Sequence, residues 1–130
     1  MKKTILGTAC LFGMLAVVFG AFGAHGLKSL VDAQSVATFE TGVMYQMYHA
    51  FFLFALGLLP NEYLKNKKTI YVCTIIGVVL FSFSIYLLSL NSLMAFDFKL
   101  FGIVTPIGGF FLIAAWALTG YGIMKSKLIK

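Results

Sequence analysis

The chain has 130 residues, of which 61% are hydrophobic and only 11% are charged, and its formal net charge is +6. A soluble domain contains roughly 45–50% apolar and about 25% charged residues, so this composition excludes an ordinary soluble protein. The basic residues are all lysines and are divided among short, separate segments. This argues against nucleic acid as a partner, since such binding needs a continuous basic surface.

Four apolar segments, at about residues 4–23, 41–59, 70–90 and 104–123, have the length of membrane-spanning helices. A hydrocarbon core about 30 Å thick requires roughly 17–25 residues in helical form. Together the segments use most of the chain. We therefore predict one membrane domain over residues 1–130, an all-α bundle of four transmembrane helices.

The lysines predict how the bundle is oriented. Eight of them lie before the first segment, between the second and third, and after the fourth. The other two connections carry one each, Lys28 and Lys99. By the positive-inside rule, the N- and C-termini are expected in the cytoplasm.

The first segment has two features that need interpretation. Lys2 and Lys3 precede an apolar run that ends in small residues, as in a secretory signal peptide. The run is longer than the apolar part of a signal peptide, and its removal would disturb the alternation of lysines, so we favour a retained helix. Small residues also recur along one of its faces and predict a close helix–helix contact; they are Ala9, Gly13, Ala16, Gly20 and Gly23.

The second segment carries the candidate site. Asp32 is a favourable N-cap, so we expect the helix to begin outside the membrane and continue to Leu59. Helical periodicity groups the polar residues on one face, opposite a face that includes Met44 and Phe51. Polar groups inside a membrane must turn toward the protein interior or a wet cavity. We predict a polar site near the outer end of the bundle, formed by His25, Tyr45, Gln46, Tyr48 and His49.

Three roles are open for the two histidines of this site. They could form hydrogen bonds that fix the register of the helices, or they could handle protons or bind a ligand. Paired ligation of a haem is a third reading, which the spacing of His25 and His49 from the helix ends disfavours.

The last two segments contain fewer polar groups. Ser82, Ser84 and Tyr86 lie in the third segment, where serines are expected to bond to backbone carbonyls or to a neighbouring helix. In the fourth segment, Thr105 could cap a helix that starts at Pro106, or the helix could start near Leu100 and kink at the proline. Trp116 is expected to be a packing residue; small residues recur here too, at Gly108, Ala115 and Gly122.

Four strings of the sequence support a resemblance that covers nearly the whole chain. They are GAFGAHGL (20–27), FETGVMYQMYHA (39–50), FSFSIY (81–86) and TPIGG (105–109). The chain resembles the YgdD/YwdK group of small bacterial membrane proteins, a domain-of-unknown-function family. The resemblance implies a multi-pass protein of the bacterial plasma (inner) membrane with no assigned activity. The family tends to have glycine where this chain has Phe83 and Ala115.

The predicted spans contain no evident nucleophile, carboxylate pair or metal cluster, so no catalytic residue, cofactor or metal is predicted. The favoured function is a non-enzymatic structural, assembly or lipid-interacting bundle. Its expected partners are membrane lipids, copies of itself or a larger membrane complex. A small transporter or carrier with a polar pocket on the second helix is the alternative. An integral membrane enzyme, acting on an isoprenoid or haem-like substrate, is a weaker one.

Overall fold

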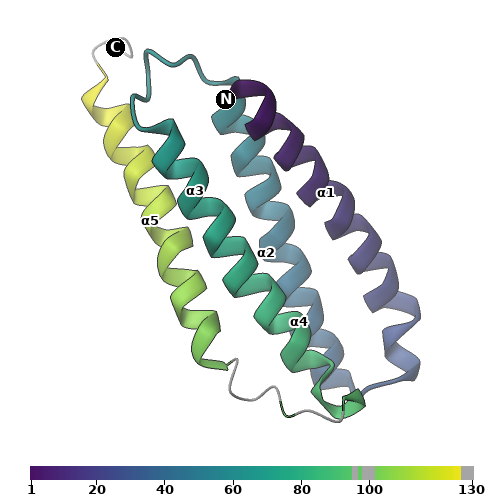
Figure 1. The fold of residues 1–130 in the computed structure, drawn as a ribbon. Coiled ribbons are helices and arrows are strands. Elements are labelled where there is room, and N and C mark those ends of the chain that lie inside the picture. Colours follow the sequence, from purple (N-terminus) through teal and green to yellow (C-terminus); the bar gives the residue numbers. More distant parts are fainter. Residues whose placement is uncertain (95–96, 98–101, 127–130) are drawn as a thin grey trace.

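The computed structural model describes residues 1–94, 97 and 102–126, and the regular elements among them are all helical (Figure 1). The predicted all-α fold is confirmed. The main helices are α1 (Lys2–His25), α2 (Ala33–Leu58), α3 (Lys67–Val78) and α5 (Val104–Lys125). The shorter elements are η1 (Leu27–Ser29), the π-helical turn η2 (Val79–Phe83), α4 (Ser84–Ser89) and η3 (Asn91–Leu93).

The helices are arranged as four rods that run alternately up and down (Figure 1). One rod combines α3, η2 and α4, which follow one another from Lys67 to Ser89 without an intervening loop. The start of α1, the loop from α2 to α3 and the end of α5 lie at one end of the bundle. The described lysines gather at that end, apart from Lys28. α1 packs mainly on α2, and α5 packs mainly on α3 and η2.

Three helical stretches of the described chain are long and apolar enough to cross a membrane: Lys2–Ser29, Lys67–Ser89 and Val104–Lys125. α2 is longer than α5, with 26 residues against 22, but polar side chains such as Glu40, Gln46 and His49 lower its hydropathy. The fourth crossing and the cytoplasmic placement of both termini therefore remain predictions.

α2 begins as the sequence predicts. The carboxylate of Asp32 accepts a hydrogen bond from the backbone N–H of Ser35 at 2.8 Å and caps the first turn. This backbone hydrogen bond holds the pKa of Asp32 below its usual value of 3.8. The helix ends at Leu58, two residues before Pro60.

The small residues of α1 form the predicted close helix–helix contact, and the partner helix is α2. Gly20 lies against Val43, and Gly23 lies against the ring of Phe39. Ala9 and Ala16 are buried on the same face. Close approach of the two backbones follows from the absence of larger side chains along this contact.

α5 approaches the α3–η2 rod even more closely. A methyl group added at Gly108 would lie 2.8 Å from the backbone carbonyl carbon of Leu80 and from Cα of Phe81. α5 starts at Val104, so Pro106 falls in the first turn, where its missing N–H leaves no bond unmade. Thr105 does not cap the helix; its hydroxyl shares a 2.7 Å hydrogen bond with the hydroxyl of Ser84. The alternative start near Leu100 falls outside the described residues.

Candidate functional site

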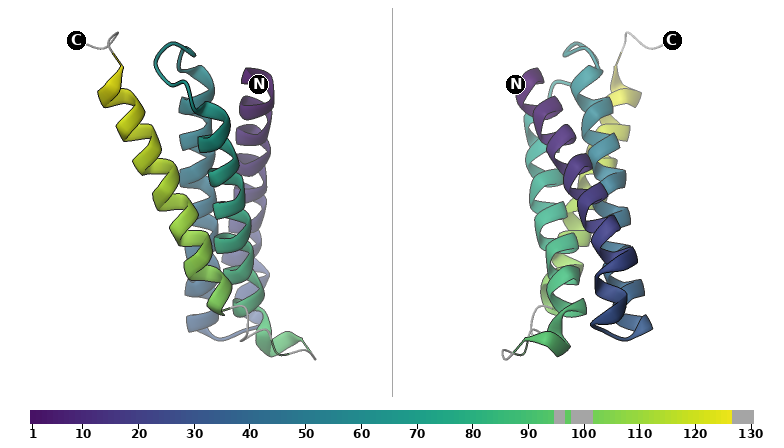
Figure 2. Two further views of the ribbon diagram at one scale, coloured as in Figure 1. Left: turned by 60° about the vertical axis from the view of Figure 1, so that its left-hand side comes forward. Right: turned by 90° about the vertical axis from the view of Figure 1, so that its right-hand side faces the viewer.

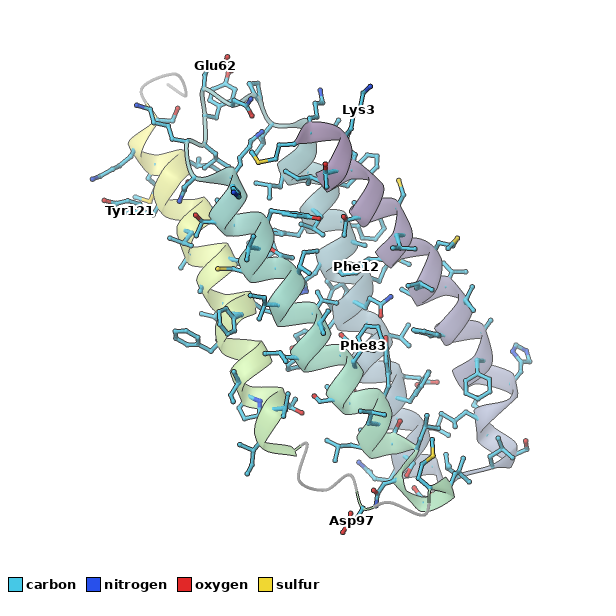
Figure 3. The ribbon with its side chains drawn as sticks, viewed as in Figure 1. Lys3, Phe12, Glu62, Phe83, Asp97 and Tyr121 are labelled. Carbon is cyan, nitrogen blue, oxygen red and sulfur yellow. The ribbon has the colours of Figure 1, made fainter. Side chains whose placement is uncertain are left out.

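Gln46 links three helices at the middle of the bundle. Its side chain is fully buried, and its Nε2 donates to the backbone carbonyl of Phe12 on α1 at 2.9 Å. Its Oε1 accepts a hydrogen bond from the hydroxyl of Tyr86 on α4, also at 2.9 Å. Phe12 lies about half-way along the bundle (Figure 3). Both polar ends of the Gln46 amide are thus occupied by protein groups, so Gln46 has a structural role in this arrangement.

His25 lies far from His49 along the bundle. It is exposed at the end of α1, and its Nδ1 bonds to the carbonyl of Ala21 in its own helix. The contact between α1 and α2 places Gly13 beside Ala50, the residue after His49. His25 is twelve residues farther along α1, about 18 Å away by helical rise. One haem iron cannot bridge two histidines at that separation, so the structure excludes paired ligation within one chain.

The polar face of α2 is divided between two surroundings. Gln46 and His49 are buried, with exposed fractions of 0% and 5%, whereas Tyr45 and Tyr48 are 39% and 56% exposed. The division arises because α1 and α4 cover one edge of this face, while the other edge faces α5 across a groove. Sequence periodicity places the four residues on one face of α2, and it does not predict this boundary.

His49 has one ring nitrogen without a partner. Its Nδ1 lies 2.8 Å from the backbone carbonyl of Tyr45. Because a carbonyl can only accept, Nδ1 carries the proton, and in the neutral ring Nε2 is left as an acceptor. Nε2 is buried and has no hydrogen-bond partner in the described part of the protein. A buried acceptor left unpaired costs about 1–3 kcal/mol, so a group that donates to Nε2 would be bound favourably.

Ser82 presents a second buried group of this kind. Its hydroxyl is fully buried in η2 and, like Nε2 of His49, has no partner among the described residues. The neighbouring serines behave as predicted: Ser84 donates to the carbonyl of Phe81, and Ser89 donates to that of Tyr86. η2 packs against both α2 and α5. π-helical turns occur frequently at functional sites. A residue of this turn, Phe81, lines the same cavity as His49.

A cavity of about 490 Å³ lies beside His49, between α2, η2 and α5. Tyr45 and His49 line it from α2, Phe81 from η2, and Leu112 and Trp116 from α5. The rings of Tyr45 and Phe81 are in contact, with their centroids 4.6 Å apart. Most of the wall is apolar, so the cavity suits an apolar molecule with few polar groups.

A second cavity, of about 370 Å³, continues the first along the same two helices. Trp116 lines both, and its ring packs on Phe52 with a centroid separation of 4.6 Å. We call the two cavities together the α2–α5 groove. α5 is tilted relative to the other helices, which keeps it apart from α2 along the groove (Figure 2). The groove depends on that tilt, so its extent along α5 could not be predicted from the sequence. Trp116, expected to be a packing residue, is 55% exposed.

The side chains that line the groove include hydrogen-bonding groups. Nε2 of His49 accepts a hydrogen bond, the indole N–H of Trp116 donates one, and the hydroxyl of Tyr45 can do either. No group of three or more histidine, cysteine or acidic side chains able to hold a metal was found in the described parts of the chain.

Comparison with known proteins places the chain in a family. Residues 19–109 match the family model described as "Protein of unknown function (DUF423)". The chain belongs to the DUF423 family. Two similar proteins are the UPF0382 inner membrane protein YgdD of Escherichia coli and the UPF0382 membrane protein YwdK of Bacillus subtilis, each 34% identical. The aligned regions cover 97% of this chain and 93% of YgdD, and 89% of this chain and 92% of YwdK.

A UPF0382 membrane protein of Haemophilus influenzae is 33% identical over 98% of both chains. No solved structure matches the chain. The predicted YgdD/YwdK resemblance and the bacterial membrane location are confirmed for this DUF423 protein. Phe83, where the sequence departs from the family pattern, is 39% exposed beside the ring of Tyr86, so the larger side chain is accommodated outside the core.

Proposed function

We propose that this DUF423 protein is a non-enzymatic, lipid-interacting bundle that binds a hydroxyl-bearing apolar molecule in the α2–α5 groove. The observation that carries the proposal is His49, whose side chain lines an apolar cavity and whose buried Nε2 is an acceptor without a donor among the described residues. Ionisable groups inside membrane proteins are costly and often mark binding sites. A donor from a ligand would remove that cost.

The groove favours a ligand that enters from the lipid. Its walls are largely aromatic and aliphatic, and its lining residues run along the lengths of α2 and α5. If α2 and α5 both cross the membrane as predicted, the groove faces the acyl chains. A molecule with an apolar body and one hydroxyl matches both the walls and the acceptor.

The experiment is native mass spectrometry of the full chain extracted in mild detergent, with identification of any co-purified molecule. We expect the wild-type protein to carry a hydroxyl-bearing apolar ligand. His49→Phe removes the acceptor and should lower occupancy about tenfold, since one hydrogen bond contributes on the order of 1–1.5 kcal/mol. Thr41→Val is the control, because the hydroxyl of Thr41 donates to the Ala37 carbonyl of its own helix.

A stability measurement separates this role from a structural one. His49→Phe also removes a buried unpaired polar atom, so the empty protein should unfold at no lower denaturant concentration than the wild type. If His49 only fixes helix register, the variant should be destabilised and no ligand should be found. Wild-type protein without a ligand, or equal occupancy in His49→Phe, would contradict the proposal.

A small carrier is the second candidate, favoured by the π-helical turn beside the cavity. The turn interrupts the regular hydrogen bonding of the α3–α4 rod at the point where α5 crosses it, and such interruptions permit helices to adjust. A carrier should move the identified ligand across the bilayer of a proteoliposome. If the protein binds the ligand but does not move it across the bilayer, the carrier candidate is excluded and the binding role is kept.

A further inference from the structure

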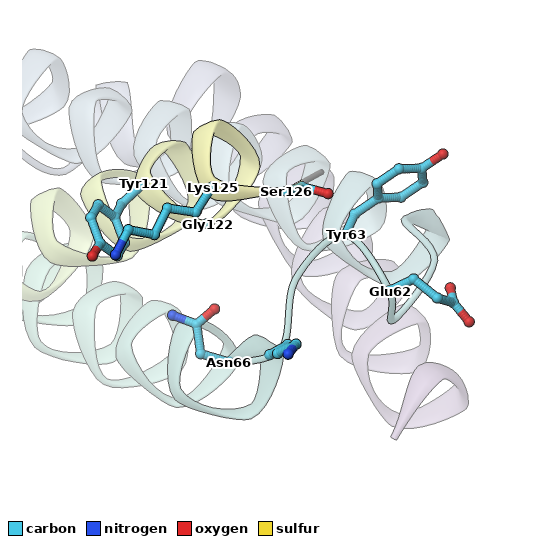
Figure 4. A pocket seen from close by; sticks show the side chains of 8 residues that line it. Glu62, Tyr63, Asn66, Tyr121, Gly122, Lys125 and Ser126 are labelled. Atoms are coloured by element: carbon cyan, nitrogen blue, oxygen red, sulfur yellow. The ribbon is translucent and has the colours of Figure 1, made fainter. Parts of the chain in front are cut away.

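A different cavity lies at the lysine-rich end of the bundle, outside the α2–α5 groove. It has a volume of about 360 Å³ and is formed by the α2–α3 loop and the end of α5 (Figure 4). Lys65 and Asn66 line it from the loop, and Tyr121 and Lys125 line it from α5. Nothing in the binding proposed for His49 involves these residues.

Packing beneath the cavity fixes its walls. Leu64 is 1% exposed and packs directly on Gly122, where an added methyl group would collide with the leucine side chain. Leu64 also belongs to the main core cluster. The loop that carries Lys65 is therefore anchored to the same turn of α5 that carries Lys125. This contact keeps both lysines at the same cavity.

The charges around the cavity favour an anion. Lys65 and Lys125 are exposed, and neither pairs with a carboxylate among the residues that the structure describes. The ammonium group of Lys125 lies 4.7 Å from the ring centroid of Tyr121. The amide of Asn66 points toward these two side chains. Glu62 also lines the cavity, but its carboxylate points away from them (Figure 4).

We propose that this cavity binds the phosphate of an anionic phospholipid headgroup. Two lysines, the amide of Asn66 and the hydroxyl of Tyr121 supply the positive charge and the donors that a phosphate requires. The cavity also lies where the apolar helices end, which is the depth of the headgroups if α5 crosses the membrane. Basic pockets between helices at a membrane surface bind lipid headgroups in this way.

The test titrates the delipidated full chain with phosphatidylglycerol or phosphatidylcholine of matched acyl chains and counts bound lipid by native mass spectrometry. We expect phosphatidylglycerol to bind more tightly than phosphatidylcholine. Lys65→Ala/Lys125→Ala should weaken phosphatidylglycerol binding about 10- to 30-fold, in line with the effect of two lysines near an anionic surface. Lys2→Ala/Lys3→Ala removes the same charge from the same end and should leave the binding within about twofold.

Three results would overturn the proposal. Equal losses in the two double variants would show a diffuse charge effect. Equal binding of both lipids would show that the cavity does not distinguish an anionic from a zwitterionic headgroup. Displacement of phosphatidylglycerol by excess inorganic phosphate alone would assign the cavity to a soluble phosphate. Lys65→Arg/Lys125→Arg should retain binding, and a thermal melt of each variant shows whether the fold is kept.

Discussion

Replacing Gly108 by alanine should separate α5 from the α3–η2 rod. The added methyl group would lie 2.8 Å from both the carbonyl carbon of Leu80 and Cα of Phe81, whereas ordinary contact begins at 3.4 Å. The helices must therefore move apart by at least about 0.6 Å. Both atoms belong to the backbone, so no side-chain rotation can relieve the collision.

The cost follows from the kind of group that must move. Overpacking of a tight contact typically destabilises a protein by about 1–3 kcal/mol, and we expect Gly108→Ala near the upper end because a rigid helix is displaced. Gly109→Ala is the matched control in the same turn. Its methyl group would lie 3.7 Å from the ring of Phe81, an ordinary contact, and alanine favours the helix by up to about 1 kcal/mol.

The assay is reversible unfolding of the purified protein in mixed micelles, followed by circular dichroism, with the two variants compared under identical conditions. We expect Gly108→Ala to lower the free energy of unfolding by about 2–3 kcal/mol and Gly109→Ala to leave it unchanged or slightly higher. Equal stability of both variants would refute the described contact between α5 and η2. So would a larger loss for Gly109→Ala.

Three further predictions concern hydrogen bonds. Tyr86→Phe leaves the buried Oε1 of Gln46 without its donor and should cost about 1–2 kcal/mol in the same unfolding assay. Ser84→Ala should cost about 0.5–1 kcal/mol, and adding Thr105→Val should cost little more if their shared bond is the one lost. The pKa of Asp32 is lower in the folded protein, so its cap stabilises α2 fully above pH 3.8 and loses effect as the pH falls through the folded pKa. Asp32→Asn, which caps without titrating, should lack this acid-dependent loss in circular dichroism.

The sequence predicted the helices well because each depends on local patterns. Apolar length defined the rods, and Asp32 marked the start of α2 through its capping chemistry. The small residues of α1 indicated a close contact, which the structure shows against α2. These signals lie within one segment, so no knowledge of neighbouring helices was needed.

Which residues form the site depends on how the helices pack against one another, so this was harder to predict. His25 and His49 were both assigned to the outer end, but the register that sets Gly13 beside Ala50 separates them by about 18 Å. The tilt of α5 exposes Trp116 to the groove, and a π-helical turn buries Ser82 without a partner among the described residues. Helix tilt and register arise from contacts between distant segments, so a single sequence gives no direct sign of them.

The most direct test of the central claim exchanges His49 for two amides that differ in reach. Glutamine places its amide near the position of Nε2, whereas asparagine places it near that of Nδ1, which already bonds to Tyr45. Occupancy of the co-purified ligand is measured for both variants by native mass spectrometry. If Nε2 accepts from the ligand, His49→Gln retains it and His49→Asn loses it about tenfold. Equal occupancy in the two variants would contradict this role for His49.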